Sequence, residues 1–156
     1  MRPFAKLFAR DREMQRRADT LVGAIPVQLP LCGQIATALA VDVPLAVIRA
    51  TAGDDPLTPQ RTFRLLAEFG SPPRVIWGDA FAAFYVVHVE RHGGAAFRAV
   101  AFDTTPGADT KLGHAVYLQG DSLYDPATHM WRKTQPADLT QFDFVAILPG
   151  REARAA

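Results

Sequence analysis

The feature that most limits the fold of this chain is a change of pattern at Ser71-Pro72-Pro73. Before this break, apolar residues recur at the three- and four-residue spacing of an amphipathic helix. After it, the apolar runs are short and rich in the β-branched and aromatic residues that favour strands. We therefore expect an α+β domain, with N-terminal helices packed on a C-terminal antiparallel sheet.

Helices are expected over residues 4–20, 32–41 and 59–69, with irregular chain at 21–31 and a loop at 51–58. The third helix has clear ends, because Thr58 can cap it, Pro59 fits its first position and Gly70 can stop it. Pro44 is expected to end or bend the second helix.

Short strands are expected after the break, at residues 75–77, 95–102, 114–118, 122–124 and 142–148. Residues 79–92 carry mixed signals, because Asp79 can cap a helix whereas the run FYVVHVE is rich in residues that favour strands. We assign this segment to a helix.

Size and composition fit one domain with a real core. The chain has 156 residues, 49% of them hydrophobic, and its net charge of +1 gives no indication of a nucleic-acid partner. No apolar run reaches the roughly 18 residues that a membrane helix needs, and the start lacks the features of a cleaved signal peptide. We expect a basic helical extension at 1–20, a main domain at 21–150 and a disordered tail at 151–156. We also expect a monomer without a membrane span, located in the cytoplasm or exported without a cleaved signal peptide.

The chain has one cysteine, which excludes an internal disulfide and a cysteine-rich zinc site. A lone cysteine is either a nucleophile or a buried apolar thiol. Cys32 opens an expected helix, where the helix dipole favours the reactive thiolate. Gly33 beside it would let a substrate backbone come close. His88 and His92 have the spacing of helical metal ligands but no accompanying carboxylate motif, so we expect neither metal nor cofactor.

Residues 113–126, GHAVYLQGDSLYDP, are typical of a tight β-hairpin. The Gly-Asp pair at 120–121 fits a two-residue type II′ turn, which has glycine at its first central position. That turn pairs Val116 with Asp125, and it puts His114 on the same face as Asp125, diagonally across the strands. Such neighbours are roughly 7–8 Å apart at Cα, within reach of two polar side chains. A three-residue loop would put them on opposite faces instead.

With the two-residue turn, Asp125 can accept a hydrogen bond from one imidazole nitrogen of His114 and leave the other nitrogen to act on a thiol. Alone, His114 fits an ordinary strand histidine, and Asp125 fits a turn residue before Pro126. Together, downstream of a cysteine that opens a helix, they favour a catalytic triad. Cys32 would be the nucleophile, His114 the base and Asp125 the residue that orients the histidine.

These residues resemble the papain-like cysteine peptidases, which carry a cysteine at a helix N-terminus, a histidine that opens a strand and an aspartate at the end of the next strand. The local likeness is closest to the peptidases that remove double-glycine leaders from bacteriocins, and to their free-standing relatives. It is carried by Cys32-Gly33 with its small, apolar helix, by the strand at 114–118 and by Asp125-Pro126-Ala127. The resemblance spans residues 28–148 and implies a papain-like fold. Papain-fold toxins that deamidate glutamine and secreted bacterial effectors share the same skeleton.

The resemblance also implies roles for neighbouring residues. The family has a glutamine about six residues before the cysteine that helps to bind the oxyanion, and Gln28, four residues upstream, is the candidate here. The backbone N–H of Cys32 is the natural second donor. Leu31 departs from the acidic or polar residue that usually precedes the cysteine. A tryptophan often shields the histidine–aspartate pair from water, and Trp131 is placed to do so, with plain core packing as the alternative.

The expected function is hydrolysis of an amide bond in a protein or peptide substrate, through a thioester on Cys32. Peptide cleavage, glutamine deamidation and peptidoglycan cross-link hydrolysis share this chemistry, and the triad does not separate them. The resemblance favours a stand-alone bacterial effector or toxin. Two alternatives stay open: a catalytically silent papain-like module that binds a partner protein, and an unrelated α+β protein in which Cys32 is structural.

Overall fold

The structure is a computed structural model, and it describes residues 2–25, 31–90, 97–103 and 114–149. Its elements are α1 (Arg2–Val22), α2 (Cys32–Val41), α3 (Leu45–Ala52), α4 (Pro59–Glu68), β1 (Arg74–Trp77), α5 (Gly78–Tyr85), the π-helical η1 (Val86–Glu90), β2 (Arg98–Asp103), β3 (His114–Gln119), β4 (Ser122–Asp125), β5 (Met130–Lys133), α6 (Pro136–Leu139) and β6 (Phe144–Ile147). Among these residues, no helix has both the length and the apolar character needed to cross a membrane.

The strands form one antiparallel sheet in the order β1-β6-β2-β3-β4-β5. The last strand of the chain, β6, therefore lies between β1 and β2. Strands β3, β4 and β5 follow one another in space as they do in sequence, and β5 forms one edge of the sheet. The α+β class expected from the sequence is confirmed.

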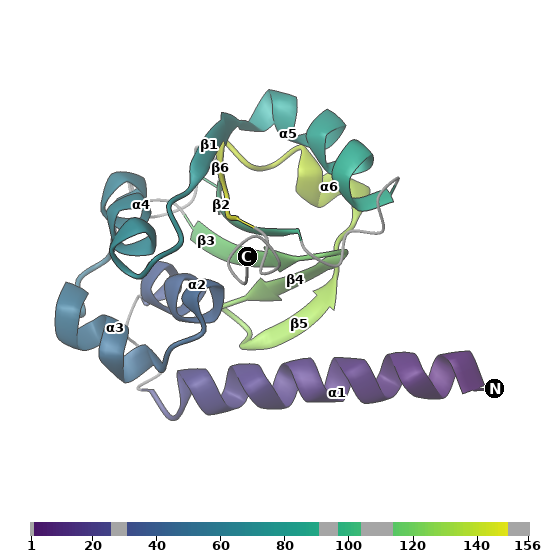
Figure 1. The fold of residues 1–156 in the computed structure, drawn as a ribbon, viewed down its shortest axis with the longest axis horizontal. Helices are drawn as coiled ribbons and strands as arrows, with labels where there is room; N and C mark the ends of the chain where they lie inside the picture. Colours follow the sequence, from purple (N-terminus) through teal and green to yellow (C-terminus); the bar gives the residue numbers. More distant parts are fainter. Residues whose placement is uncertain (1, 26–30, 91–96, 104–113, 150–156) are drawn as a thin grey trace.

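Hydrophobic cores lie on both faces of the sheet (Figure 1). Helices α1 to α4 cover one face, and α5 covers the other. Strand β3 serves both cores by alternation, because Ala115 and Tyr117 point to the first and Val116 and Leu118 to the second. The N-terminal helices thus pack on the sheet as expected, and the helix expected after residue 79 closes the opposite face.

Local signals explain several helix ends. The side chain of Thr58 accepts a hydrogen bond from the N–H of Arg61 at 3.1 Å, so it caps α4 as expected, with Pro59 at the first helical position. Past this helix the chain turns through Gly70, whose φ of +86° suits glycine. The bounds of α2 agree with the expected helix at 32–41.

The sequence pattern fails to indicate three elements. Helix α3 follows Pro44 directly, so residues 51–52, expected in a loop, belong to its last turn. Strand β5 has mostly exposed side chains and therefore lacks the apolar alternation that marks a half-buried strand. Helix α6 is only four residues long, too short for a helical period to stand out. The expected helix at 79–92 is present through α5 and η1 as far as Glu90, and residues 91–96 lie outside the described part.

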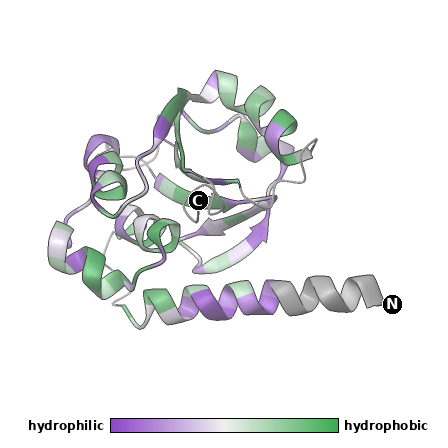
Figure 2. Ribbon diagram, viewed as in Figure 1, coloured by the Kyte–Doolittle hydropathy of each residue, from purple (hydrophilic) through white to green (hydrophobic). Residues whose placement is uncertain are grey.

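Helix α1 is joined to the main domain by its C-terminal half. Ala18, Leu21 and Val22 are only 1%, 6% and 5% exposed and belong to the first core. Figure 2 shows the same contrast, with hydrophobic residues near the C-terminal end of α1 and mostly hydrophilic ones in its middle. Helix α1 therefore continues two residues past the boundary expected at residue 20, and its last turn is buried against the main domain. The expected tail at 151–156 lies outside the described residues.

Candidate active site

Cys32 is the first residue of α2, and its hydrogen-bonding partners come from β3. The thiol is half-buried and hydrogen-bonds to the side chain of His114 and the backbone N–H of Ala115. Leu31, which precedes the helix, makes no side-chain capping bond. The N–H groups of the first turn have no partners within the helix, and their dipoles favour a negative charge at this end.

His114 and Asp125 meet across the hairpin of β3 and β4. The last pair before the turn is Gln119 with Ser122, which is the register of a two-residue loop. Gly120 has a φ of +57°, as a type II′ turn requires at its first central position. The imidazole Nε2 of His114 lies 2.8 Å from Oδ1 of Asp125. The contact predicted from the hairpin is therefore confirmed.

A single imidazole thus lies between a thiol and a carboxylate. Because Asp125 is bonded to Nε2, the nitrogen left for Cys32 is Nδ1. The carboxylate can only accept, so it keeps a proton on Nε2 and fixes the tautomer of the neutral ring. This is the order of groups that nucleophile, base and orienting residue require.

The charges in this cluster favour a thiolate–imidazolium pair. The hydrogen bonds that His114 makes to Asp125 and then to Cys32 raise the pKa of His114 to about 10, against the lowering effect of burial. Burial raises the pKa of Cys32, but the hydrogen bonds to His114 and Ala115 and the charge of His114 lower it by more, so the net shift is downward. An acidic thiol beside a protonated histidine is the reactive form of cysteine.

The carboxylate of Asp125 is held by its own turn. Its Oδ1 also accepts a hydrogen bond from the N–H of Ala127 at 2.9 Å, which is the geometry of an Asx turn. Its carbonyl oxygen accepts from the N–H groups of Thr128 at 3.1 Å and His129 at 2.9 Å. The pKa of Asp125 is lowered, chiefly by the hydrogen bond with His114. The orienting carboxylate is therefore charged and fixed in position.

The other expected site residues have different outcomes. Gln28, expected to bind the oxyanion, lies outside the described residues. Gly33 is buried, and Leu57 fills the space that a side chain would take, with its Cβ 3.1 Å from the ideal Cβ position. Gly33 therefore allows the chain around Leu57 to pack on α2. We expected this glycine to leave room for a substrate backbone, but on this face Leu57 takes that room. Leu31 is 1% exposed and belongs to the core.

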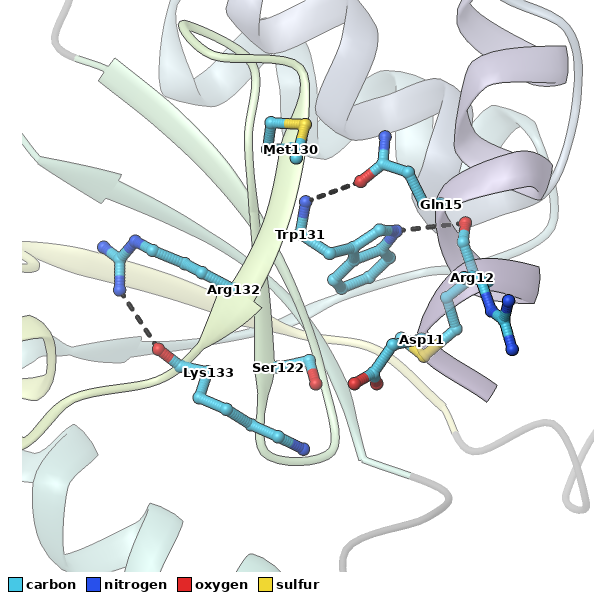
Figure 3. Close-up of a pocket in the computed structure, with 9 residues that line it drawn as sticks. Asp11, Arg12, Gln15, Ser122, Met130, Trp131, Arg132 and Lys133 are labelled. Carbon is cyan, nitrogen blue, oxygen red and sulfur yellow. Dashed lines mark hydrogen bonds between the residues drawn. The ribbon is translucent and has the colours of Figure 1, made fainter. Parts of the chain in front are cut away.

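Trp131 packs in the first core and against α1. Its ring makes edge-to-face contacts with Tyr117 and Tyr124, at centroid distances of 5.8 and 5.6 Å. Its Nε1 donates to the carbonyl of Met14 at 3.2 Å, and its backbone N–H donates to Oε1 of Gln15 at 2.9 Å (Figure 3). These contacts favour the core-packing alternative for Trp131 over a shield for the histidine–aspartate pair.

Two supporting groups could not be assigned from the sequence. The backbone N–H of Ala115 supports the thiol, and no side-chain signal marks it. Gln34 is fully buried and donates to the carbonyls of Gly53 at 3.2 Å and Asp55 at 2.7 Å, which holds this loop beside the first turn of α2. A polar amide on an otherwise apolar helix face was the available signal for such a role.

Within the described part of the chain, no group of three or more histidine, cysteine or acidic side chains is arranged to hold a metal ion. His88 stacks on Phe84 with ring centroids 4.0 Å apart, and His92 lies outside the described residues.

The arrangement of Cys32, His114 and Asp125 is the basis for assigning a function to this chain. No protein-family model matches the sequence, and no curated protein matches it significantly.

Proposed function

We propose that this chain is a cysteine hydrolase of the papain-like kind, which cleaves an amide bond through a thioester on Cys32. The observation that carries the proposal is the position of His114 between the thiol of Cys32 and the carboxylate of Asp125. A purely structural thiol does not need a histidine–aspartate pair beside it, because a buried free cysteine behaves as a small apolar residue. The downward shift in the pKa of Cys32 further supports a reactive role.

In the first half of the reaction, the thiolate of Cys32 attacks the carbonyl carbon of the amide. The electron pair of the C=O bond moves to the oxygen, and a tetrahedral intermediate forms. When it collapses, the C–N bond breaks and the leaving nitrogen takes the proton of the His114 imidazolium. The products of this half are a free amine, or ammonia from a glutamine side chain, and a thioester on Cys32.

In the second half, neutral His114 takes a proton from water as the water oxygen attacks the thioester carbonyl. Collapse of the second tetrahedral intermediate breaks the C–S bond, releases a carboxylic acid and restores the thiolate–imidazolium pair. Asp125 keeps its negative charge throughout, so it stabilises the imidazolium and holds the ring without itself transferring a proton.

The negative oxygen of each intermediate needs donors aimed at it. The backbone N–H of Cys32, at the N-terminal end of α2, is one candidate. Gln28 remains our proposed second donor on the strength of the family resemblance. Donors of this kind commonly contribute about 2.7–4 kcal/mol to the stability of the transition state.

The direct test is to trap the thioester. The protein would be incubated with a peptide mixture prepared from a whole proteome, quenched in acid and analysed by intact mass and peptide mapping. We expect an added acyl group on Cys32 that hydroxylamine removes. In the released peptides, new amino termini would identify a peptidase, and conversion of glutamine to glutamate would identify a deamidase.

Cys32→Ala is the matched control, since it keeps a small side chain at the start of α2. It should give neither the adduct nor altered peptides. If the wild type forms no adduct and alters no peptide, or if Cys32→Ala alters them equally, the hydrolase proposal fails and a binding or structural role for the domain takes its place.

A further inference from the structure

Helix α1 is in contact with both parts of the chain that supply the candidate triad. At its C-terminal end, Ala18 and Leu21 are buried in the core shared with α2, the helix that begins at Cys32. On the surface, Arg17 pairs with Asp42, just beyond the end of α2, at 2.9 Å. In Figure 1, α1 runs from the α2–α3 side of the molecule past β5.

The second contact of α1 is with the outer edge of β5. The side-chain amide of Gln15 donates from Nε2 to the carbonyl of His129 at 2.8 Å and accepts at Oε1 from the N–H of Trp131 at 2.9 Å. The amide thus pairs with an edge strand as the backbone of a neighbouring strand would. Figure 3 shows Gln15 reaching across to the strand, with the Trp131 indole bonded to the backbone of α1.

The carbonyl that Gln15 holds belongs to the turn that carries Asp125. His129 is the last residue of this turn, and its N–H donates to the carbonyl of Asp125 at 2.9 Å. It has a φ of +57°, a conformation uncommon for a residue other than glycine. A turn held in such a conformation depends on the hydrogen bonds at its two ends, one of which is made by Gln15.

Among the described residues, the hydrogen bonds between α1 and β5 come from two neighbouring residues of α1, Met14 and Gln15. A pocket of about 600 Å³ lies between α1 and β5, and another of about 300 Å³ is lined by α1, the end of α2, β3 and Trp131. Gln15 borders the first pocket, and Trp131 borders both. Loss of the Gln15 amide would therefore not be compensated by close packing around it.

We propose that α1 is a strap that holds the helix of Cys32 and the hairpin of His114 and Asp125 in register, and that Gln15 is a positioning residue for Asp125. Gln15 acts through the His129 carbonyl and touches no group of the triad. The catalytic purpose of this strap rests on the proposed function. The effect of Gln15 on the geometry of the His114–Asp125 pair can be tested separately.

The test is a pH titration of His114 in a Cys32→Ser background, in which NMR of the imidazole nitrogens reports the protonation state of the ring. In this background Asp125, itself near Arg132, is the charged group hydrogen-bonded to the ring, and Asp103 lies directly opposite His114 in the register of β2 and β3. Gln15→Met keeps the length and helix propensity of the side chain but removes its hydrogen bonds to His129 and Trp131, together with a third to the side chain of Asp19. We expect it to lower the pKa of His114 by about one unit, a roughly tenfold change in the protonation equilibrium. Gln15→Glu, which keeps only the acceptor for Trp131, should have a smaller effect in the same direction.

Arg16→Ala is the control, because Arg16 is an exposed residue of the same helix whose side chain pairs with Glu13. It should leave the titration of His114 unchanged, and thermal unfolding of each variant would show that all are folded at the temperature of the titration. An unchanged pKa in both Gln15 variants, or an equal shift in Arg16→Ala, overturns the strap. Failure of the hydrolase proposal would appear elsewhere, as an ordinary pKa for Cys32 in the wild type, and would leave this titration readable.

Discussion

Replacing Asp125 with asparagine isolates what the carboxylate contributes to the site. Asparagine has nearly the same shape, and its oxygen can still accept from His114 and from the N–H of Ala127, so the turn should persist. Only the negative charge is lost. The expected result is that the imidazolium form of His114 loses most of its stabilisation, and that the thiolate of Cys32 becomes less favoured with it.

The size of the effect follows from the contacts of the ring. The pKa of His114 rises from 6.5 to about 10, which would correspond to about 5 kcal/mol if Asp125 acted alone. Cys32 shares in that shift, and solvent screens the pair because the two side chains are 37% and 26% exposed. A hydrogen bond to a charged group contributes about 1.5–3 kcal/mol. We therefore expect Asp125→Asn to lower the pKa of His114 by roughly one to two units.

The same loss should appear in the free energy of unfolding, measured by urea denaturation across pH. The folded pKa of His114 lies above its unfolded value of 6.5, so its stabilisation is complete below pH 6.5 and is lost as pH rises towards 10. The folded pKa of Asp125 lies below 3.8, so its stabilisation is present above that pH and is lost as pH falls through the folded pKa. The wild type should exceed the variant most between pH 3.8 and 6.5.

NMR titration of His114 and the urea series should agree on this window. If His114 of the variant titrates as in the wild type, the charge of Asp125 has no part in the shift. A stability difference that is constant from acid to alkaline pH would lead to the same conclusion, because a titrating pair cannot produce it.

Two further substitutions test the packing around the sheet. Gly78→Ala should destabilise the protein by about 3 kcal/mol or more in urea denaturation, because the new Cβ would collide with the backbone carbonyl of Phe142. A loss of stability below about 1 kcal/mol would show that the close approach of the two backbones is not needed. Tyr124→Phe should leave the stability unchanged or raise it by up to about 1 kcal/mol, because the buried hydroxyl has no hydrogen-bond partner among the described residues. A clear loss of stability in Tyr124→Phe would mean that the hydroxyl is satisfied.

The parts of the fold that the sequence predicts are those fixed by local chemistry. Thr58 and Gly70 mark the ends of a helix through capping and a positive φ, which depend on neighbouring residues alone. The hairpin of β3 and β4 is also fixed by neighbouring residues. Gly120 selects the type of turn, and the turn sets the register that brings His114 to Asp125.

What the sequence does not predict depends on contacts between distant segments. Strand β5 is polar and exposed, and it is a strand because it pairs with β4. The partners of Gln15 lie 114 and 116 residues along the chain, and no local pattern marks them. The meeting of Cys32 with His114 is of the same kind: the residue types suggested a triad and the family resemblance supported it, but no local pattern placed the two side chains together. The space at Gly33 was misjudged because Leu57, which fills it, comes from a separate segment.

Alkylation of Cys32 by iodoacetamide, measured as a function of pH in the wild type and in His114→Ala, shows whether His114 makes Cys32 an acidic nucleophile. The wild type should react fast, with an apparent pKa well below the ordinary value of about 8.5. His114→Ala should lose this reactivity at low pH and titrate near the ordinary value. An inert Cys32, or a profile that is the same with and without His114, would contradict the account.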